Sequence, residues 1–281
     1  MLISIIKLVI ILIIMLWGGV TNWKFIDKSY EKFGVKEGYK YGLAIACHNR
    51  PEYVKKSLES LKKTVLNDIY ICIIDDKSDN KETIELIKNF HIDNVKIEKI
   101  YSDKNEGIGK TLIKAFDILS PKCEYLIILD SDTLLNKKWL IKLQDSYDAA
   151  VKSDLKYPNH IVTGFNCQQS CGHKTVKEYD NFIVKKTIGG INMFFKKELY
   201  HEIFKGCLQG DSWDWCVCEK MPGFIATKPS VVQHIGKNGM FSSGERYDNA
   251  EDFISEYFFQ GKKKGYVFTT KNDNTGYYRD K

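Results

Sequence analysis

Arginine is scarce in this sequence. Only three of the 42 lysine and arginine residues are arginines, namely Arg50, Arg246 and Arg279, and the formal net charge is +6. Proteins that read nucleic acids favour arginine, because its planar guanidinium pairs with base edges and phosphates. The lysines are spread along the chain, so we interpret the positive charge as a source of solubility and of mild attraction to anions. We expect no nucleic-acid partner.

Two common ligand-binding motifs are also missing. The loop at 107–109 contains glycines but lacks both the G-x-G-x-x-G pattern and the G-K-[ST] ending of phosphate-binding loops. Phosphates bound by this chain must therefore be neutralised in another way. The cysteines form no C-x2-C pair, and the spacing of Cys167, Cys171 and His173 argues against a zinc site. A Cys167–Cys171 disulfide stays open for a lumenal domain.

The N-terminal segment is strongly hydrophobic. Residues 2–17 are apolar except for Ser4 and Lys7. A bilayer span needs about 20 residues, so we expect residues 1–20 to form a single-pass membrane anchor. A cleaved signal peptide and a buried core helix are the alternatives. Five lysines follow the hydrophobic segment: Lys24, Lys28, Lys32, Lys36 and Lys40. By the positive-inside rule they favour a cytosolic globular domain, without excluding a lumenal one.

Strand and helix patterns alternate after a polar, lysine-rich stem at 21–40. Short apolar runs predict strands, and apolar residues at helical spacing predict the helices between them. This alternation predicts an α/β fold with a Rossmann-like, mostly parallel central sheet, right-handed crossovers and flanking helices. The strands are predicted at 41–47, 69–74, 95–101 and 125–129.

Each of these predicted strands ends in polar residues. The carboxyl ends of parallel strands share one edge of a sheet, and α/β proteins bind ligands at that edge. A lone acid there is usually a helix cap, but four polar loops, two of them with paired acids, indicate a nucleotide pocket. The polar residues are His48, Asn49, Arg50, Asp75, Asp76, Asn105, Asp130 and Asp132.

Asp130 and Asp132 are the centre of this pattern. They directly follow the uninterrupted apolar run at 125–129 and are separated by one serine. A strand-end turn can aim both carboxylates at one ion. A Mg²⁺ or Mn²⁺ ion that also holds phosphate oxygens needs only one or two carboxylates from the protein. The alternative is that the acids merely end the strand and cap the next helix.

Four motifs occur in order along this half of the chain: C-H-N-R-P-E at 47–52, D-D-K-S-D at 75–79, N-E-G at 105–107 and L-D-S-D at 129–132. The ordered set resembles the nucleotide-binding half of family 2 glycosyltransferases, and the resemblance extends over about residues 41–240. It implies a single domain with the A-type glycosyltransferase fold. It also implies a nucleoside-diphosphate sugar as co-substrate, with Mn²⁺ or Mg²⁺ bridging the diphosphate.

The resemblance further implies roles for individual residues. Asp76 or Asp75 would accept a hydrogen bond from the base edge, Asn49 and Arg50 would line the same wall, and Asp130 would lie near the ribose. Similar enzymes also have a glycine pair before a strand, here Gly189 and Gly190, which would admit a sugar close to the backbone or form a simple bend. The implied donor site comprises His48, Asn49, Arg50, Asp75, Asp76, Asn105, Asp130 and Gly190.

The metal would be bound by residues from both halves of the domain. The resemblance assigns it to Asp132 and, from the second half, to a histidine. His234 follows an apolar run that begins at Val231. A neutral imidazole is a good ligand for Mn²⁺. The alternative for His234 is a purely structural histidine.

Asp211 and Asp214 are the candidates for the general base. They stand beside Trp213 and Trp215. Aromatic faces stack on sugars, and a carboxylate in a partly desolvated site can accept the proton of an attacking hydroxyl. We assign the base to Asp214, with Asp211 as the alternative. The family often has an acid where this chain has Cys216, which leaves the register of this assignment open.

These observations predict a nucleotide-sugar half at 41–132, an acceptor-binding and catalytic half at 133–248, and a C-terminal helix with a basic tail at 249–281. The predicted activity is an inverting, metal-dependent transfer from a nucleoside-diphosphate donor, UDP-linked by expectation, to a hydroxyl of a glycan, lipid or protein. A single hydrophobic segment argues against a processive synthase. The alternatives are a nucleotidyltransferase, whose glycine-rich first loop is missing, and an inactive carbohydrate-binding protein.

Overall fold

The computed structural model describes residues 38–157, 159–167, 173–236, 250, 265–271 and 274–279. The chain divides into two compact units, Met1–Glu37 and Gly38–Lys281, and only the second contains described residues. The predicted anchor at 1–20 and nearly all of the predicted stem therefore lie outside them. Within the described ranges, no helix combines the length and the apolar character needed to cross a membrane.

A nine-stranded sheet forms the centre of the second unit, in the order β3-β2-β1-β4-β9-β6-β10-β8-β7. Its first four strands are all parallel, which confirms the prediction for this half. Helices connect them, as expected for parallel neighbours. These strands are β1 (Tyr39–Cys47), β2 (Ile69–Asp75), β3 (Lys96–Tyr101) and β4 (Cys123–Leu129).

The other half of the sheet corrects the prediction of a mostly parallel sheet. β9 runs antiparallel to β4 and β6, and β8 runs antiparallel to β7 and β10, so the sheet is mixed. Only residues 179–181 join β7 to β8, and so short a connection permits a hairpin but no parallel crossover. The strands are β6 (Ile161–Thr163), β7 (Thr175–Glu178), β8 (Phe182–Lys185), β9 (Asn192–Lys196) and β10 (Phe224–Thr227).

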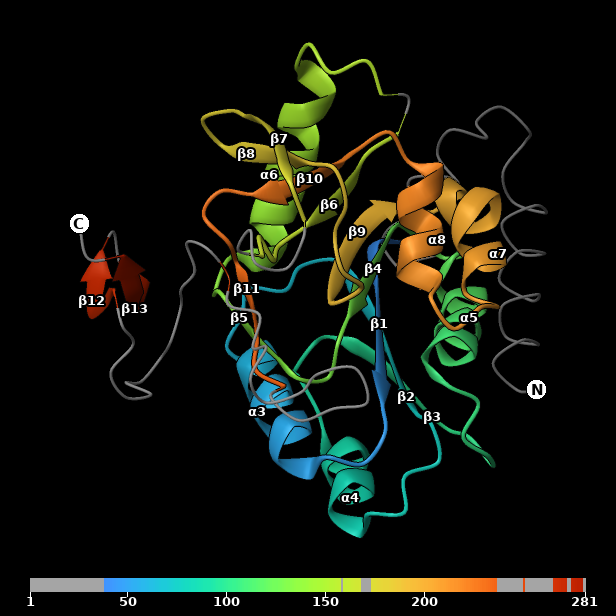
Figure 1. Ribbon diagram of the computed structural model, residues 1–281. Helices are drawn as coiled ribbons and strands as arrows, with labels where there is room; N and C mark the ends of the chain where they lie inside the picture. The colour runs from blue at the N-terminus through green and yellow to red at the C-terminus, as the bar shows by residue number, and fades with distance from the viewer. Residues whose placement is uncertain are drawn as a thin grey trace, which may run out of the picture. The chain divides into compact units, whose positions relative to one another are not determined.

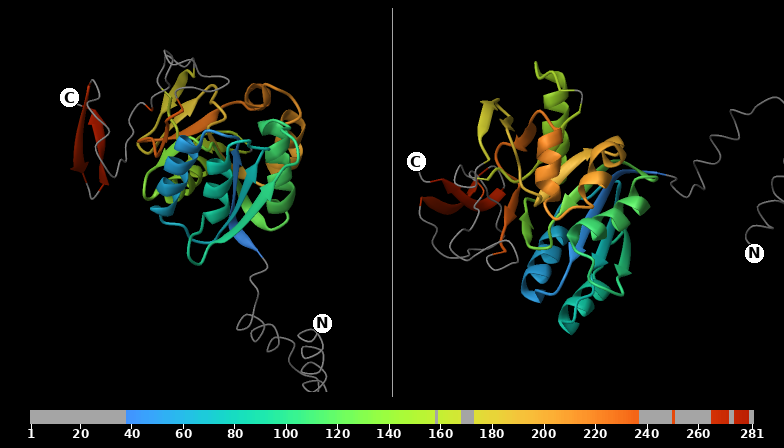
Figure 2. Two further views of the ribbon diagram at one scale, coloured as in Figure 1. Left: turned by 90° about the horizontal axis from the view of Figure 1, so that it is seen from below. Right: turned by 45° about the vertical axis from the view of Figure 1, so that its right-hand side comes forward.

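Helices cover both faces of the sheet and enclose two hydrophobic cores (Figures 1 and 2). β1 shows the alternation that a strand imposes, because Leu43 and Ile45 belong to one core and Ala44 to the other. One face carries α3 (Pro51–Lys62), α4 (Lys81–Asn89) and α6 (Trp139–Lys152). The other carries α5 (Ile108–Leu119), the π-helical turn η2 (Tyr200–Phe204), α7 (Lys205–Cys207) and α8 (Trp213–Lys220).

A separate two-stranded ribbon joins distant parts of the chain. β5 (Thr133–Leu135), which comes shortly after β4, pairs antiparallel with β11 (Val232–His234). The register places His234 opposite Thr133. Ser60 of α3 supports the ribbon, since its Oγ accepts a hydrogen bond from Leu135 N at 2.8 Å. The ribbon thereby carries His234 to the carboxyl end of β4.

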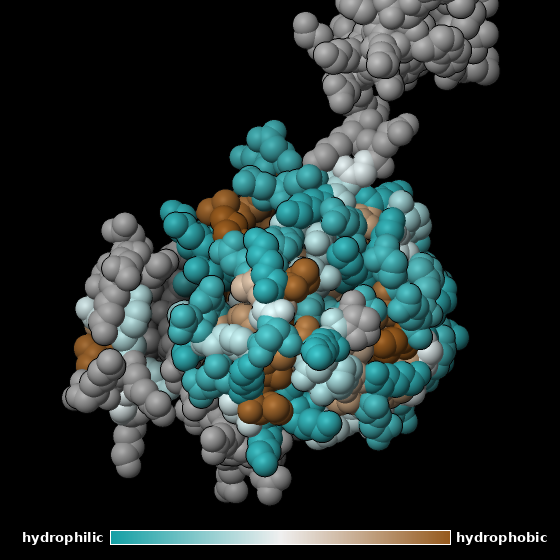
Figure 3. All heavy atoms as spheres, turned by 90° about the horizontal axis from the view of Figure 1, so that it is seen from above, coloured by the Kyte–Doolittle hydropathy of each residue, from teal (hydrophilic) through white to brown (hydrophobic). Residues whose placement is uncertain are grey.

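The C-terminal part differs from the predicted helix and basic tail at 249–281 where it is described. β12 (Tyr266–Lys271) and β13 (Asn274–Arg279) pair antiparallel as a hairpin. The helix predicted around Phe253, Tyr257 and Phe258 falls outside the described residues. On the face drawn in Figure 3, hydrophobic residues form small separate patches among hydrophilic ones. Scattered exposure of this kind is usual for folded proteins.

Candidate active site at the carboxyl edge of the sheet

The loops that follow β1, β2, β3 and β4 lie along one edge of the sheet, as predicted (Figure 1). Two backbone hydrogen bonds continue the pairing beyond the strand ends. Asp76 N donates to Cys47 O at 2.8 Å, and Ser102 N donates to Asp75 O at 2.9 Å. The loops after β1, β2 and β3 are therefore held side by side, and the predicted nucleotide residues gather there.

Asn49 joins the loop after β1 to the start of α4. Asn49 and the following Arg50 both adopt the left-handed conformation, with φ of 52° and 59°. Asparagine is one of the few residue types that adopts it readily. Asn49 Oδ1 accepts hydrogen bonds from Asp79 N and Asn80 N, each at 3.0 Å, and Asn49 N donates to Ser78 Oγ at 2.7 Å. These contacts fix the turn from which Arg50 projects.

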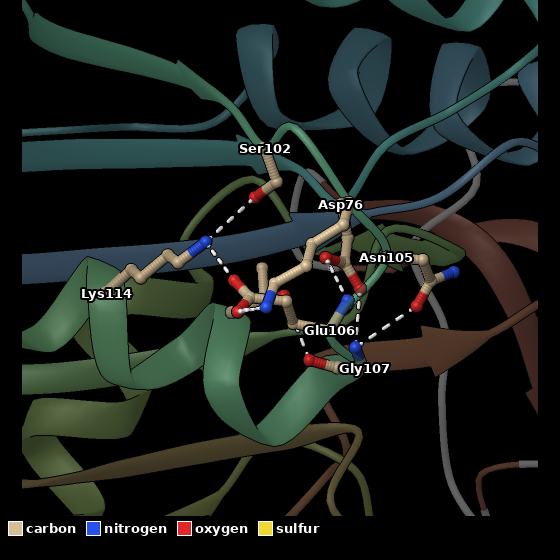
Figure 4. Close-up of polar contacts among 8 residues, drawn as sticks. Asp76, Ser102, Asn105, Glu106, Gly107 and Lys114 are labelled. Atoms are coloured by element: carbon tan, nitrogen blue, oxygen red, sulfur yellow. Dashed lines mark hydrogen bonds and ion pairs between the residues drawn. The ribbon is translucent and has the colours of Figure 1, made fainter.

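Asp76 holds the loop that follows β3 (Figure 4). Its Oδ1 accepts a hydrogen bond from Glu106 N at 3.0 Å, and its Oδ2 accepts one from Gly107 N at 2.8 Å. Glu106 forms an ion pair with Lys114 of α5, whose Nζ also donates to Ser102 Oγ at 3.2 Å. Backbone donors thus engage both Asp76 oxygens, so Asp76 shapes the pocket and offers little to a ligand.

Asp75 has a different environment. Its Oδ2 accepts a hydrogen bond from Ser78 N at 3.1 Å, whereas its Oδ1 is buried and has no hydrogen-bond partner among the described residues. Buried polar atoms in proteins nearly always have a partner, often supplied by a ligand or water. Of the two acids that the sequence left open for the base edge, Asp75 is therefore the one with a carboxylate oxygen that has no partner among the described residues.

His48 and Asn105 line the same edge. His48 Nδ1 lies 2.9 Å from Asp76 O, and because a carbonyl oxygen only accepts, Nδ1 is the donor. His48 Nε2 is then the acceptor, 3.1 Å from Asn49 Nδ2 and 3.2 Å from Asn105 Nδ2. The neutral tautomer protonated on Nδ1 satisfies all three contacts. The structure thus brings these predicted residues together as a neutral polar cluster.

Asp132 contacts residues from two distant parts of the chain, Arg50 and His234. Its Oδ2 lies 2.7 Å from Arg50 Nη2 and 3.3 Å from His234 Nε2. Burial alone would raise the pKa of Asp132, but the hydrogen bonds and positive charge supplied by His234 and Arg50 outweigh it and hold the pKa below its ordinary value. His234 thus meets the acid with which the sequence paired it. Arg50, which the resemblance places on the wall of the base, lies against the candidate metal ligand.

The backbone of Gly236 packs directly against Asp132 and Arg50. A Cβ at this position would lie 2.1 Å from Asp132 Oδ2 and 2.6 Å from Arg50 Nη2. The preceding residue adds a hydrogen bond from Ile235 N to Asp132 O at 2.8 Å. Sequence reasoning did not assign Gly236 to the site. The available signal was its position two residues after His234.

Asp130 and Asp214 are close enough to influence each other. Burial raises the pKa of Asp130 well above its ordinary value, the negative charges of Asp132 and Asp214 raise it further, and Arg50 opposes them. Asp214 lies in the first turn of α8, and its Oδ1 accepts a hydrogen bond from Trp215 N at 2.9 Å. Asp211 is exposed. Of the two candidate bases, Asp214 is therefore the one whose charge acts on Asp130.

The segment before β9 holds α8 against the site. Ile191 O accepts a hydrogen bond from Asp130 N at 2.9 Å, and Cys218 Sγ donates to Ile188 O at 3.3 Å. A Cβ at Gly190 would lie 2.5 Å from Trp213 Cζ2. On that side Gly190 makes room for an indole ring, and the sugar that we expected there would meet Trp213. Trp213 itself is buried.

A disulfide joins Cys207 of α7 to Cys216 of α8. The sequence did not identify this pair, because the pairing depends on how the two helices pack. Cys167 is also disulfide-bonded, and Cys171, the partner that the sequence left open for a lumenal domain, lies outside the described residues. Three cysteines of the central strands are buried free thiols, and burial raises their pKa to about 12: Cys47, Cys72 and Cys123.

The residues around Asp132 could supply only some of the ligands that a divalent cation needs. Asp132 Oδ1 is buried without a hydrogen-bond partner in the described part of the chain, and the neighbouring imidazole suits Mn²⁺. No group of three or more His, Cys, Asp or Glu side chains with metal-binding geometry occurs in the described ranges. The protein would thus supply two ligands, and phosphate oxygens and water would supply the others.

Comparison with known proteins gives a curated relative from Methanocaldococcus jannaschii, named "Uncharacterized glycosyltransferase MJ1057". It is 34% identical over 101 residues, which cover 36% of this chain and 34% of the relative. This chain therefore spans about a third of the length of the curated relative that it matches.

Two solved structures are also similar. Staphylococcus aureus TarS 1–349 in complex with UDP-GlcNAc has a TM-score of 0.47 at 16% identity, over 67% of this chain and 55% of that chain. The mannosyltransferase PcManGT from Pyrobaculum calidifontis, in complex with GDP-Man and Mn²⁺, has a TM-score of 0.43 at 13% identity, over 59% of this chain and 46% of that chain.

The most extensive sequence match is to a protein family. Residues 43–203, more than half of the chain, match the family described as Glycosyl transferase family 2. The matched range contains the second half of β1, all of β2 to β4, the polar loops at their ends and the acids Asp130 and Asp132. The chain belongs to glycosyl transferase family 2.

Proposed function

We propose that this chain transfers one sugar from a nucleoside-diphosphate donor, UDP-linked by expectation, to an acceptor hydroxyl with inversion and with the help of a divalent cation. One observation carries the proposal. Asp132 lies 3.3 Å from His234 Nε2, although the two residues are 102 positions apart, and Asp130 and Asp214 lie in the same electrostatic environment. Acids and an imidazole gathered at the ligand-binding edge of an α/β sheet suit the divalent cation with which a sugar diphosphate binds.

Donor binding would use the polar loops. The unpartnered Asp75 Oδ1 would accept a hydrogen bond from a base N–H, while His48 and Asn105 would line the pocket. Asp130 would lie near the ribose. Asp132 and His234 would hold Mn²⁺ or Mg²⁺, which when bound stabilises the charge that develops on the leaving diphosphate. Arg50 Nη2 lies 2.7 Å from Asp132, so its positive charge would also act on phosphates bound through a cation on Asp132.

Transfer would need a base close to the acceptor. We assign this role to Asp214, with Asp211 as the weaker candidate because it is exposed and Asp214 is half-buried. The acceptor hydroxyl would give its proton to the Asp214 carboxylate while its oxygen forms a bond to the anomeric carbon. The bond from that carbon to the diphosphate oxygen breaks, and the electron pair leaves with the diphosphate. Attack opposite the leaving group gives inversion.

The test is donor turnover by the full chain purified in detergent. UDP- and GDP-sugars would be offered with Mn²⁺, with Mg²⁺ or with a chelator, and Asp132→Asn and His234→Ala would be compared with exposed controls, Asp145→Asn and His91→Ala. We expect metal-dependent turnover of one donor that both site variants lose and both controls keep. No turnover, together with no metal-dependent nucleotide binding by calorimetry, would overturn the proposal and favour a carbohydrate-binding role.

Membrane attachment through residues 1–20 is part of the same proposal. The support is the hydrophobic composition of the segment, which lies outside the described residues. Fractionation of cells that express the full chain or a form lacking residues 2–20 tests it. Retention of both forms in the membrane fraction would refute an anchor in this segment.

A further inference from the structure

Trp215 is the exposed member of the tryptophans in the described ranges. Trp139 and Trp213 are 0% and 5% exposed, whereas Trp215 is 52% exposed. A single exposed aromatic residue is ordinary. Trp215 differs because it directly follows Asp214, the assigned base, and because its own N–H donates to Asp214 Oδ1 at 2.9 Å. The exposed ring is therefore next along α8 to the residue that we assign as the base.

A second ring extends this surface. The His173 and Trp215 ring centroids lie 6.1 Å apart, with an angle of 30° between the ring planes. His173 Nδ1 lies 2.9 Å from Thr187 Oγ1, and a Cβ at Gly189 would lie 3.6 Å from His173 Nε2. His173 thus contacts the segment 187–191, which reaches Asp130 through the hydrogen bond from Asp130 N to Ile191 O. The two rings stand beside the reacting end of the site.

The helix that carries Trp215 is fixed at three points. The buried Trp213 ring packs against Gly190, Cys218 Sγ donates to Ile188 O at 3.3 Å, and a disulfide joins Cys216 to Cys207. A ring held on such a helix loses little freedom when a ligand stacks on it, which favours binding. The arrangement therefore has the properties of a preformed binding surface.

We propose that Trp215 and His173 form an acceptor subsite for a carbohydrate, on which a hexopyranose stacks with one hydroxyl directed to Asp214. The inference rests on the proposed function and narrows its acceptor from glycan, lipid or protein to a glycan. The C–H face of a pyranose matches an exposed indole. A lipid chain would need a longer apolar surface, but the neighbours of His173 are a hydroxyl residue and a glycine, Thr187 and Gly189.

The test separates donor chemistry from acceptor binding. The full chain would be given the donor that it hydrolyses, together with nitrophenyl hexopyranosides, a short peptide containing serine and threonine, or a prenyl phosphate. We expect transfer to a pyranoside, and we expect Trp215→Ala to raise the acceptor KM by about tenfold without changing the donor KM. His173→Ala should raise the acceptor KM less, and Trp215→Phe should restore most of the affinity because it keeps a ring.

Val176→Ala is the control, because Val176 is an exposed hydrophobic residue on β7, 59% exposed. Saturation-transfer NMR with the same pyranosides reports binding without turnover, and thermal unfolding checks that each variant folds. Failure of the wild type to hydrolyse any donor would count against the proposed function. Donor hydrolysis with no pyranoside bound or used, transfer to the peptide or prenyl phosphate alone, or an unchanged acceptor KM in Trp215→Ala would overturn the inference.

Discussion

Arg50 Nη2 lies 2.7 Å from Asp132 Oδ2, so a guanidinium neutralises the candidate metal ligand in the structure itself. Arg50 projects from a left-handed turn at the start of α3, and its guanidinium also lies 4.5 Å from the centre of the Tyr53 ring. Asp132 Oδ2 is shared with His234, at 3.3 Å. A cation that binds Asp132 therefore meets an arginine that is already in place.

Replacement of Arg50 should change metal and nucleotide binding in opposite directions. Arg50→Gln removes a positive charge beside Asp132, so we expect Mn²⁺ to bind about tenfold more tightly in the absence of nucleotide. UDP should bind more weakly, because a charge near the diphosphate is lost. The electron paramagnetic resonance signal of free Mn²⁺ measures Mn²⁺ binding, and titration calorimetry measures UDP binding. Arg50→Lys keeps the charge and should stay near the wild type, and weaker Mn²⁺ binding by Arg50→Gln would contradict this account.

Gly236→Ala should damage the site more than the fold. The new Cβ would lie 2.1 Å from Asp132 Oδ2, so the acid, Arg50 or the backbone must move. Disturbing the surroundings of a metal ligand typically costs 10- to 100-fold in metal affinity or activity, and we expect an activity loss of about that size. Gly206→Ala is the matched control, because a Cβ there meets nothing within 4 Å. Equal activity of the two variants would show that the site tolerates the added methyl group.

The two neighbouring glycines before β9 should respond differently to the same change. A Cβ at Gly190 would lie 2.5 Å from Trp213 Cζ2, whereas one at Gly189 would make an ordinary contact with His173 Nε2 at 3.6 Å. Overpacking of this kind costs about 1–3 kcal/mol, so Gly190→Ala should lower the free energy of unfolding by that amount. Gly189→Ala should change it by less. Urea unfolding measures both, and equal effects would refute the packing role of Gly190.

Asp117 should make stability depend on pH at the acidic end. Tyr200 Oη and Lys205 Nζ each donate to Asp117 Oδ1 at 2.7 Å. Burial alone would raise the pKa of Asp117, but the hydrogen bonds from Lys205 and Tyr200 and the Lys205 charge outweigh it and lower the pKa. A folded-state pKa below the unfolded value gives stability that is present above the unfolded pKa and is lost as the pH falls through the folded pKa.

Asp117→Asn should therefore lower the free energy of unfolding at neutral pH, by up to about 1 kcal/mol since solvent screens this half-exposed pair. The difference from the wild type should shrink as the pH falls below about 4, where the unfolded aspartate becomes protonated. Urea unfolding at several pH values measures this. Asp145→Asn, on the exposed side of α6, is the control. A difference between Asp117→Asn and wild type that does not vary with pH would contradict the linkage.

Local sequence patterns were sufficient for the parallel half of the fold and for much of the site. The runs that end at Cys47, Asp75, Tyr101 and Leu129 are strands in the structure, and their polar loops share one edge. That outcome follows from sequence because each strand and helix is encoded by the residues within it, and parallel strands joined by helices have little choice of arrangement.

The sequence by itself determined which residues could carry the chemistry: paired acids after a buried strand, a histidine after another and an acid between tryptophans. Only the tertiary structure decided how these residues are used. It engaged Asp76 with backbone donors and left an oxygen of Asp75 open, moved Arg50 to Asp132, filled the space beside Gly190 with Trp213, and joined Cys207 to Cys216. The antiparallel arrangement of β7, β8 and β9 was likewise decided by the tertiary structure. Each of these features depends on how separate helices, strands and loops pack against one another, and no local sequence pattern contains that packing.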